Sequence, residues 1–137
     1  MADLSITAGN VVPSTTAQKL NGKAGAAINA GQIVYLDSST SSYKLADGND
    51  PIKLPAVGIA GNTAGIGQQV QVITADPNLT IGTHSLGLGI PMFLSANPGM
   101  ICPFGDLSTG NQTTCVFVTN TATTVSFGII GGVGAHA

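Results

Sequence analysis

The residues of this sequence whose side chains could do chemistry are few and lie far apart. Cys102, Cys115 and Ser85 are the candidate nucleophiles, and His84 and His136 are the candidate general bases. Ser85 lacks the G-x-S-x-G context of a nucleophile elbow, in which a sharp turn exposes the serine hydroxyl. Cys115 falls within a predicted strand, and no acid or orienting group can be assigned to it. We therefore expect no catalytic residues and predict that the protein is not an enzyme.

Metal and cofactor motifs are also missing from the sequence. The two cysteines and two histidines do not form CxxC or any other zinc-binding spacing. Residues 47–50 (Asp-Gly-Asn-Asp) lack the alternating order and the terminal glutamate of a calcium loop. The glycine-rich stretches at 58–61 and 131–134 lack the lysine that follows a phosphate-binding loop. We therefore expect no metal site, no cofactor and no small-molecule substrate.

The aspartates and cysteines have structural interpretations. Five aspartates lie close to Gly, Pro, Ser or Asn, and these are Asp37, Asp47, Asp50, Asp76 and Asp106. In such turns an Asp side chain accepts hydrogen bonds from nearby backbone N–H groups, which explains these residues without catalysis. Cys102 and Cys115 are predicted to be free, buried thiols in a reducing cytoplasm. A disulfide is the alternative if their strands are neighbours.

Charge is scarce in this chain. Only 7% of its 137 residues are charged, as four lysines and six aspartates, whereas about 25% is usual in soluble domains. Four lysines cannot form the basic surface that nucleic acid or anionic lipid requires, and no apolar run of about 18 residues could span a membrane. A surface of small uncharged polar residues loses its water easily, which favours a protein whose faces are buried in an assembly. A neutral soluble domain is the alternative.

The pattern of apolar residues predicts one all-β domain. β-Branched residues are abundant, and 19 glycines and 7 prolines interrupt the chain at short intervals, as in proteins built from many short strands. A chain of 137 residues fits one domain. Strands are predicted at 32–37, 43–46, 56–60, 69–74, 90–95, 100–104, 115–117 and 125–127, with a turn at 76–78.

The second half of the chain repeats the plan of the first half. Residues 90–95 match residues 32–37 at an offset of 58, and the strands and turns that follow correspond with small shifts. We expect two similar hairpin-containing halves packed into one small β-barrel or β-sandwich. The alternative is that two β-meanders with similar turns resemble each other by chance.

The first 23 residues differ from the rest of the chain. They contain isolated apolar residues among small polar ones, followed by Pro13 and a Ser-Thr-Thr stretch. We predict an extended N-terminal arm over residues 1–23 and a single compact β domain over residues 24–137. The start of the sequence lacks the basic region of a signal peptide. The apolar, glycine-rich end at 128–137 is interpreted as a last strand that frays or as a segment that docks on a neighbour.

Several segments resemble small virion proteins of tailed phages. In the first half they are 30–37 (AGQIVYLD), 43–47 (YKLAD) and 56–60 (AVGIA), and in the second half they are 98–103 (PGMICP) and 105–110 (GDLSTG). Those proteins have an AGQ-V-Y-x-D strand, a hairpin return that ends in AD, and a GIA strand. Their second half has a similar proline, glycine and DL pattern. The resemblance covers about residues 28–132 and points to the capsid decoration (cement) proteins.

The resemblance implies a structural protein that binds the outside of the capsid, usually as a homotrimer, and holds neighbouring capsomers together. Its partners would be the major capsid protein and further copies of itself, on the virion exterior after synthesis in the host cytoplasm. In that family an N-terminal arm commonly contacts the capsid, so the contact residues here would be Leu4, Ile6, Val11 and Val12. Deleting residues 1–20 should then leave a folded body that no longer binds capsids. A tail or fibre subunit, or another self-assembling β protein, is the alternative.

Overall fold

The computed structural model describes residues 3–107 and 113–130, and within these ranges the regular elements are strands and short 3-10 turns. The strands are β1 (Gln18–Lys23), β2 (Ile33–Asp37), β3 (Ser42–Leu45), β4 (Ala56–Ala60), β5 (Gln69–Thr80), β6 (Pro91–Leu94), β7 (Ile101–Pro103), β8 (Cys115–Thr119) and β9 (Thr124–Ile130). The 3-10 turns are η1 (Ala8–Asn10), η2 (Pro51–Lys53) and η3 (Phe104–Asp106). The all-β prediction is confirmed.

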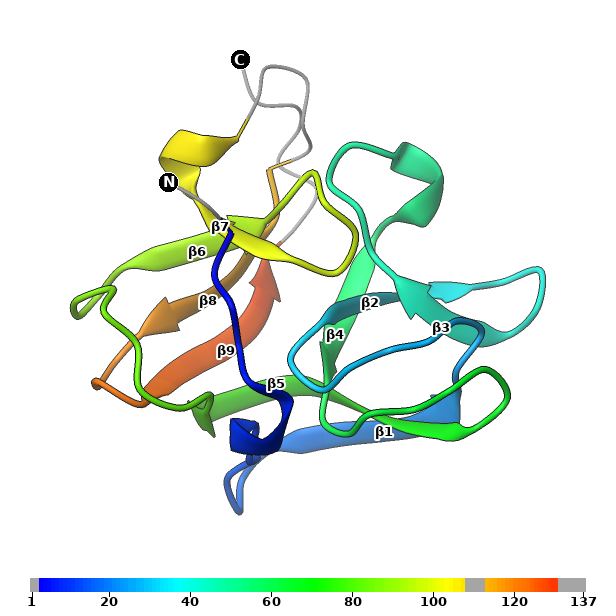
Figure 1. The fold of residues 1–137 in the computed structure, drawn as a ribbon, viewed down its shortest axis with the longest axis horizontal. Helices are drawn as coiled ribbons and strands as arrows, with labels where there is room; N and C mark the ends of the chain where they lie inside the picture. The colour runs from blue at the N-terminus through cyan, green and yellow to red at the C-terminus, as the bar shows by residue number, and fades with distance from the viewer. Residues whose placement is uncertain (1–2, 108–112, 131–137) are drawn as a thin grey trace.

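All strand pairs are antiparallel, and the strands form one curled sheet in the order β3-β2-β4-β5-β9-β8-β6-β7, with β1 paired to β5. The long strand β5 joins two parts of this sheet. Its first half pairs with β1 and β4, and its second half pairs with β9. The sheet therefore divides into a first lobe (β1–β4 and the start of β5) and a second lobe (the end of β5 and β6–β9), which lie side by side in Figure 1.

One predicted turn lies inside a strand instead. Residues 76–78 carry a proline and were expected to end the strand that begins at Gln69. In the structure β5 continues to Thr80, and its pairing with β9 shifts register between Asp76 and Leu79. A shift of this kind tolerates a proline because it removes a ladder hydrogen bond locally, and it bends the strand. The bend falls where β5 passes from one lobe to the other.

The predicted repeat is confirmed by the strand order. The first lobe runs β3-β2-β4-β5, and the second lobe runs β7-β6-β8-β9, so each lobe has a hairpin followed by two further strands in the same arrangement. The irregularities also correspond. The β2–β4 pair shifts register between Val34 and Tyr35, and the β6–β8 pair shifts between Met92 and Phe93, which is the same place at the offset of 58.

Burial distinguishes the two lobes although their topology is the same. Successive residues of a strand point to opposite faces of the sheet. In the first lobe Val34 points into a small core, which consists of Ala24, Ile28, Val34, Tyr43, Ala60, Ala64, Val70 and Val72. Its neighbours Ile33 and Tyr35 point to the other face, into the main core that lies between the lobes.

The equivalent residues of the second lobe face the other way relative to the cores. Met92, which corresponds to Val34, is fully buried in the main core together with Leu94, Phe117 and Phe127. The main core therefore lies between two strand faces: the face of the first lobe that carries Ile33 and Tyr35, and the face of the second lobe that carries Met92. As a consequence, the remaining face of the second lobe points away from both cores.

Connecting segments complete the small core of the first lobe. Residues 24–31 and 61–68 cross its inner face and pair with each other, with N···O distances of 2.9 Å in both directions between Ile28 and Ala64. Ala24 and Ile28 are at most 1% exposed. The first lobe is therefore covered on both faces, by these segments on one side and by the second lobe on the other.

The N-terminal segment, defined here as residues 3–17, runs between the two lobes (Figure 1, dark blue). Leu4 pairs with Ile101 of the second lobe, and Val12 pairs with Thr80 near the end of β5. Residues 18–23, which were assigned to the arm, form β1 on the edge of β5. In this structure the segment that was predicted to be an arm therefore shares the core and the sheet of the remaining chain.

Candidate functional site

The surroundings of His84, a candidate general base, indicate a structural role for its side chain. His84 is half-buried, and its Nδ1 accepts a hydrogen bond from the backbone N–H of Leu86 at 3.3 Å. The neighbouring Ser85 is exposed. His136 lies outside the described residues. His84 thus fixes its own loop, and no catalytic arrangement forms around it within the described residues.

The two cysteines are free; Cys102 is buried, as predicted, whereas Cys115 is only half-buried. Phe93 of β6 pairs with Cys102 of β7 on one side and with Cys115 of β8 on the other, so β6 separates the two thiols. Burial raises the pKa of Cys102 to about 11, and burial also raises the pKa of Cys115. A raised pKa favours the neutral thiol, which is a weaker nucleophile than the thiolate.

The aspartates of the turns accept local backbone hydrogen bonds, as predicted for this residue type. The donors are the N–H groups two residues further along the chain: Ser39 for Asp37 at 3.0 Å, Asn49 for Asp47 at 2.8 Å, Ile52 for Asp50 at 3.0 Å and Asn78 for Asp76 at 3.0 Å. Across residues 3–107 and 113–130, His, Cys, Asp and Glu side chains do not gather in groups of three or more that could hold a metal ion.

Assembly surfaces are the remaining candidates for function, and the N-terminal segment is the first. It is tied to the second lobe at its start, because the Asp3 carboxylate accepts hydrogen bonds from Ser95 Oγ at 2.8 Å and Asn97 Nδ2 at 2.7 Å. The backbone N–H of Leu4 donates to the carbonyl of Ile101 at 2.7 Å. These contacts join the first described residues of the chain to a turn and a strand about 90 residues further along.

A buried carboxylate ties the other end of the segment to β5. Asp76 is fully buried and accepts hydrogen bonds from the backbone N–H of Ser14 at 2.7 Å and from the Ser14 hydroxyl. Burial acts to raise the pKa of Asp76, but the hydrogen bonds from Ser14 and Asn78 outweigh it and lower the pKa. Asp76 therefore remains ionised and holds the segment at the bend of β5.

The four predicted contact residues differ in exposure. Leu4 and Ile6 are partly buried against the main core, and Val11 is 7% exposed. The Val12 side chain is 53% exposed, although the Val12 backbone pairs with Thr80. With the segment in this position, Val12 is the one of the four that offers most of its side chain to a partner.

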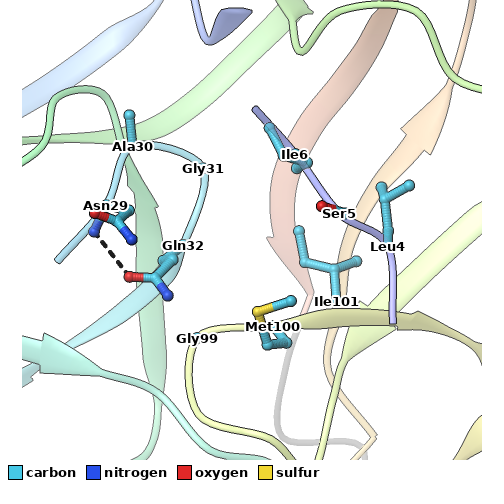
Figure 2. Close-up of a pocket in the computed structure, with 10 residues that line it drawn as sticks. All are labelled: Leu4, Ser5, Ile6, Asn29, Ala30, Gly31, Gln32, Gly99, Met100 and Ile101. Carbon is cyan, nitrogen blue, oxygen red and sulfur yellow. Dashed lines mark hydrogen bonds between the residues drawn. The ribbon is translucent and has the colours of Figure 1, made fainter. Parts of the chain in front are cut away.

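A pocket of about 150 Å³ lies beside this segment. Figure 2 shows Leu4 and Ile6 on one side of it, Ala30 and Gly31 on the opposite side, and Ile101 below. Gly31 has a φ of +95°, and a Cβ at this position would lie 2.9 Å from Ile6 Cγ2. The close approach of Ile6 therefore requires glycine in this turn. The pocket is a gap between the segment and the lobes, and it holds no cluster of ionisable side chains.

The second candidate surface is the face of the second lobe that points away from both cores. We call it the second-lobe outer face, and strand register places on it Pro91, Phe93, Val118, Ser126 and Gly128, with Phe104 of η3 packed on Phe93. The rings of Phe93 and Phe104 meet edge to face with centroids 5.4 Å apart. Phe104 is 51% exposed and Val118 is 37% exposed. The described residues thus leave apolar side chains on this sheet face in contact with solvent.

The equivalent face of the first lobe is buried. Strand pairing makes Ile59 equivalent to Val118, and Ile73 equivalent to Ser126. Both isoleucines are 0% exposed in the main core, whereas Val118 and Ser126 are exposed. Gly128 lies on the same face as Ser126, and a Cβ built there would meet no described atom within 4 Å. The same position in two similar lobes is therefore closely packed in one and open in the other, as far as the described residues show.

Charge separates the two halves of the chain as well. Asp106 is the single charged residue in the sequence after Asp76, so the other charges belong to the N-terminal segment and the first lobe. Asymmetry of this kind is visible in the sequence and is a signal for an interaction surface. It indicates that the second lobe presents a surface that loses its water at little electrostatic cost.

Comparisons with protein-family models, with characterised proteins and with solved structures find no match to this chain. Within residues 3–107 and 113–130, no helix has the length and apolar character needed to cross a membrane.

Proposed function

We propose that this chain is a structural virion protein that binds the outer surface of a tailed-phage capsid as a homotrimer and stabilises the shell. The observation that carries the proposal is the second lobe, which has Asp106 as its single charge after Asp76 and exposes Phe104 and Val118 on one strand face among the described residues. Exposed apolar side chains grouped on one face mark a site of protein interaction. The sequence resemblance to decoration proteins gives the partner: the major capsid protein, together with further copies of the chain.

The segments that carry the resemblance build the scaffold of the lobes. Residues 30–37 lead into and form β2, residues 43–47 include the end of β3, and Ala56–Ala60 is β4. Residues 98–103 form the turn before β7 and β7 itself. The resembling segments thus lie on the strands that form the two lobes. The capsid role is proposed from the family that these segments resemble.

The mechanism would be mechanical. A trimer that engages several sites on the shell keeps each contact at a high effective concentration, so contacts that are weak alone hold together. No covalent step and no turnover is needed. The protein would act on the virion exterior after synthesis in the host cytoplasm.

The N-terminal segment is proposed to contribute to shell binding through its exposed side. Val12 would contact the major capsid protein, whereas Leu4, Ile6 and Val11 hold the segment between the lobes and would reach the shell only if the segment left this position. Deleting residues 1–20 would remove these core contacts. It would also remove the two hydrogen bonds that the Ser14 backbone N–H and hydroxyl donate to Asp76. We therefore expect the deletion to destabilise the body, so a single substitution is the sharper test.

Cosedimentation with capsids tests the proposal. Capsids of the phage that encodes the chain, purified without this protein, should bind the wild type. Val12→Glu should weaken binding by about tenfold or more, because a charge would have to be desolvated at the contact. Leu36→Glu is the matched control, since Leu36 is 47% exposed on the first lobe.

Each failure has its own meaning. A wild-type protein that does not bind capsids contradicts the proposed function, and binding to tails in place of capsids would assign the chain to tail or fibre subunits. Wild-type affinity in Val12→Glu would contradict the contact role of the N-terminal segment alone.

A further inference from the structure

We propose that the second-lobe outer face is the surface through which copies of this chain associate with one another. The inference deepens the proposed function, on which it rests, by naming the occupant of one surface. It concerns contacts between copies, and shell binding is a separate property that can be measured independently.

The repeat shows what this strand face does when a partner is present. The corresponding face of the first lobe carries Ile33, Ile59 and Ile73. Each of these side chains is 0% exposed, because the second lobe packs against this face. In the second lobe the corresponding positions are Pro91, Val118 and Ser126, and all three are exposed. The described residues therefore place a protein layer on this face in the first lobe and none on it in the second.

The chemistry of the second-lobe outer face suits a protein contact. Phe104 and Val118 are apolar and partly exposed, and Gly128 leaves room for an incoming side chain. Ser126 is exposed and pairs across the strands with Val118, so the face also carries a small polar group that can accept or donate a hydrogen bond. Apolar side chains at the centre with small polar residues beside them are the usual composition of protein interfaces.

The distribution of charge favours a second copy of this chain over a different protein. In a symmetric homo-oligomer each charge at the interface is repeated in every copy, so charges near the axis meet their own likeness and repel. A different partner can supply the opposite charge and gives no reason to remove charges of both signs. After Asp76 the sequence has lost both signs, with Asp106 as the single exception. Neutrality of this extent suits a surface that lies near the symmetry axis of a homo-oligomer.

Two charge substitutions test the inference. Val118→Glu and Ser126→Glu place a carboxylate on the second-lobe outer face at exposed positions, so the fold should be kept. Leu20→Glu is the matched control, because Leu20 is 50% exposed on β1 of the first lobe. Molar mass would be measured by sedimentation equilibrium over a series of concentrations, and circular dichroism would confirm that each variant is folded.

The wild type and Leu20→Glu should sediment at a multiple of 13.6 kDa. Val118→Glu and Ser126→Glu should raise the dissociation constant by about tenfold or more, because like charges would face each other between copies. A wild type that is monomeric at every concentration overturns the inference. So does wild-type association in a folded Ser126→Glu.

Capsid cosedimentation of the same variants separates this inference from the proposed function. Variants that dissociate into monomers and bind capsids more weakly, through lost avidity, support both. Unchanged association together with lost capsid binding would assign the second-lobe outer face to the shell protein and overturn the inference while leaving the proposed function intact. Association that depends on this face in a protein that binds no capsid would support the inference and contradict the proposed function.

Discussion

The two lobes have the same strand order, yet the described residues pack against both faces of the first lobe and against only one face of the second. In the first lobe the segments at 24–31 and 61–68 cover one face and the second lobe covers the other. In the second lobe the inner face fills the main core, and the other face meets no layer of described residues. The comparison teaches that the repeat preserves the pairing of strands, whereas the packing partner decides which faces are buried.

The residues at equivalent positions follow this difference. Ile59 and Ile73 pair with each other in the main core, and the corresponding pair of the second lobe is Val118 and Ser126. A large aliphatic side chain stabilises a strand by burial, whereas an open position selects for no such volume. The composition of the two faces thus records whether each face is covered within one chain.

Truncation of equivalent residues should have the largest and most unequal effect. Ile59→Ala should cost about 2–5 kcal/mol of unfolding free energy, because it leaves a cavity in the main core. Val118→Ala should change the stability of the isolated monomer by less than about 0.5 kcal/mol, as for most surface positions. Urea denaturation of both variants measures the difference. Equal losses would show that the second-lobe outer face is already buried within one chain.

Removal of the carboxylate at the bend of β5 tests the junction between the lobes. Asp76→Ala should cost about 1–3 kcal/mol, because the N–H groups of Ser14 and Asn78, in part-buried hydrogen bonds, lose their acceptor. Amide hydrogen exchange should also become faster in the N-terminal segment. Asp50→Ala, which removes the cap of η2 at an exposed position, is the control and should affect exchange only locally. Unchanged protection of the Val12 and Ser14 amides in Asp76→Ala would refute the tie.

The same carboxylate should make stability depend on pH in the acid range. The pKa of Asp76 is lowered in the folded state from an ordinary value of 3.8, so its stabilising effect is fully present above that value. The effect is lost as the pH falls below 3.8 toward the folded-state pKa. Asp76→Asn should flatten this part of the stability profile measured by urea denaturation between pH 7 and pH 2. A variant with the wild-type slope would show that other carboxylates cause the acid loss.

Alanine substitutions at two strand glycines should affect stability very differently, and Gly128→Ala should have the smallest effect of all. Gly128→Ala should change stability by less than about 0.5 kcal/mol, since its Cβ would meet no described atom within 4 Å. Gly58→Ala should destabilise the protein clearly, because its Cβ would lie 2.4 Å from the carbonyl oxygen of Ile73, which belongs to the backbone. Thermal unfolding monitored by circular dichroism compares the two. A marked loss in Gly128→Ala would indicate that the second-lobe outer face is closed.

Much of the scaffold could be predicted from the sequence, because the strands of the two hairpins have clear apolar patterns and the repeat at an offset of 58 joins them. β1 was missed for a physical reason. Its residues are mostly exposed on both faces, so it has no alternating apolar pattern, and it is held by backbone pairing with β5. The continuation of β5 beyond Thr74 was missed because the register shift at Asp76 accommodates Pro77 inside the strand.

The candidate surfaces were harder to predict from the sequence. Val34 and Met92 are both apolar, and nothing in their local pattern shows that one faces a small core and the other faces the core between the lobes. Leu4 and Ile6 look like free anchors in a polar segment, but their burial depends on the space that the two lobes leave between them. The loss of charges after Asp76 was readable from the sequence and would have pointed to the second lobe.

The position of the N-terminal segment also has a consequence for the order in which the protein folds. Leu4 pairs with Ile101, and Asp3 binds Ser95 and Asn97, so these residues can meet their partners only after the chain has been made as far as β7. Contacts between residues so distant in sequence carry a high entropic cost and form late. Until the main core has formed, the apolar side chains of the segment have nothing to pack against. We therefore expect the N-terminal segment to be among the last parts of this fold to be ordered.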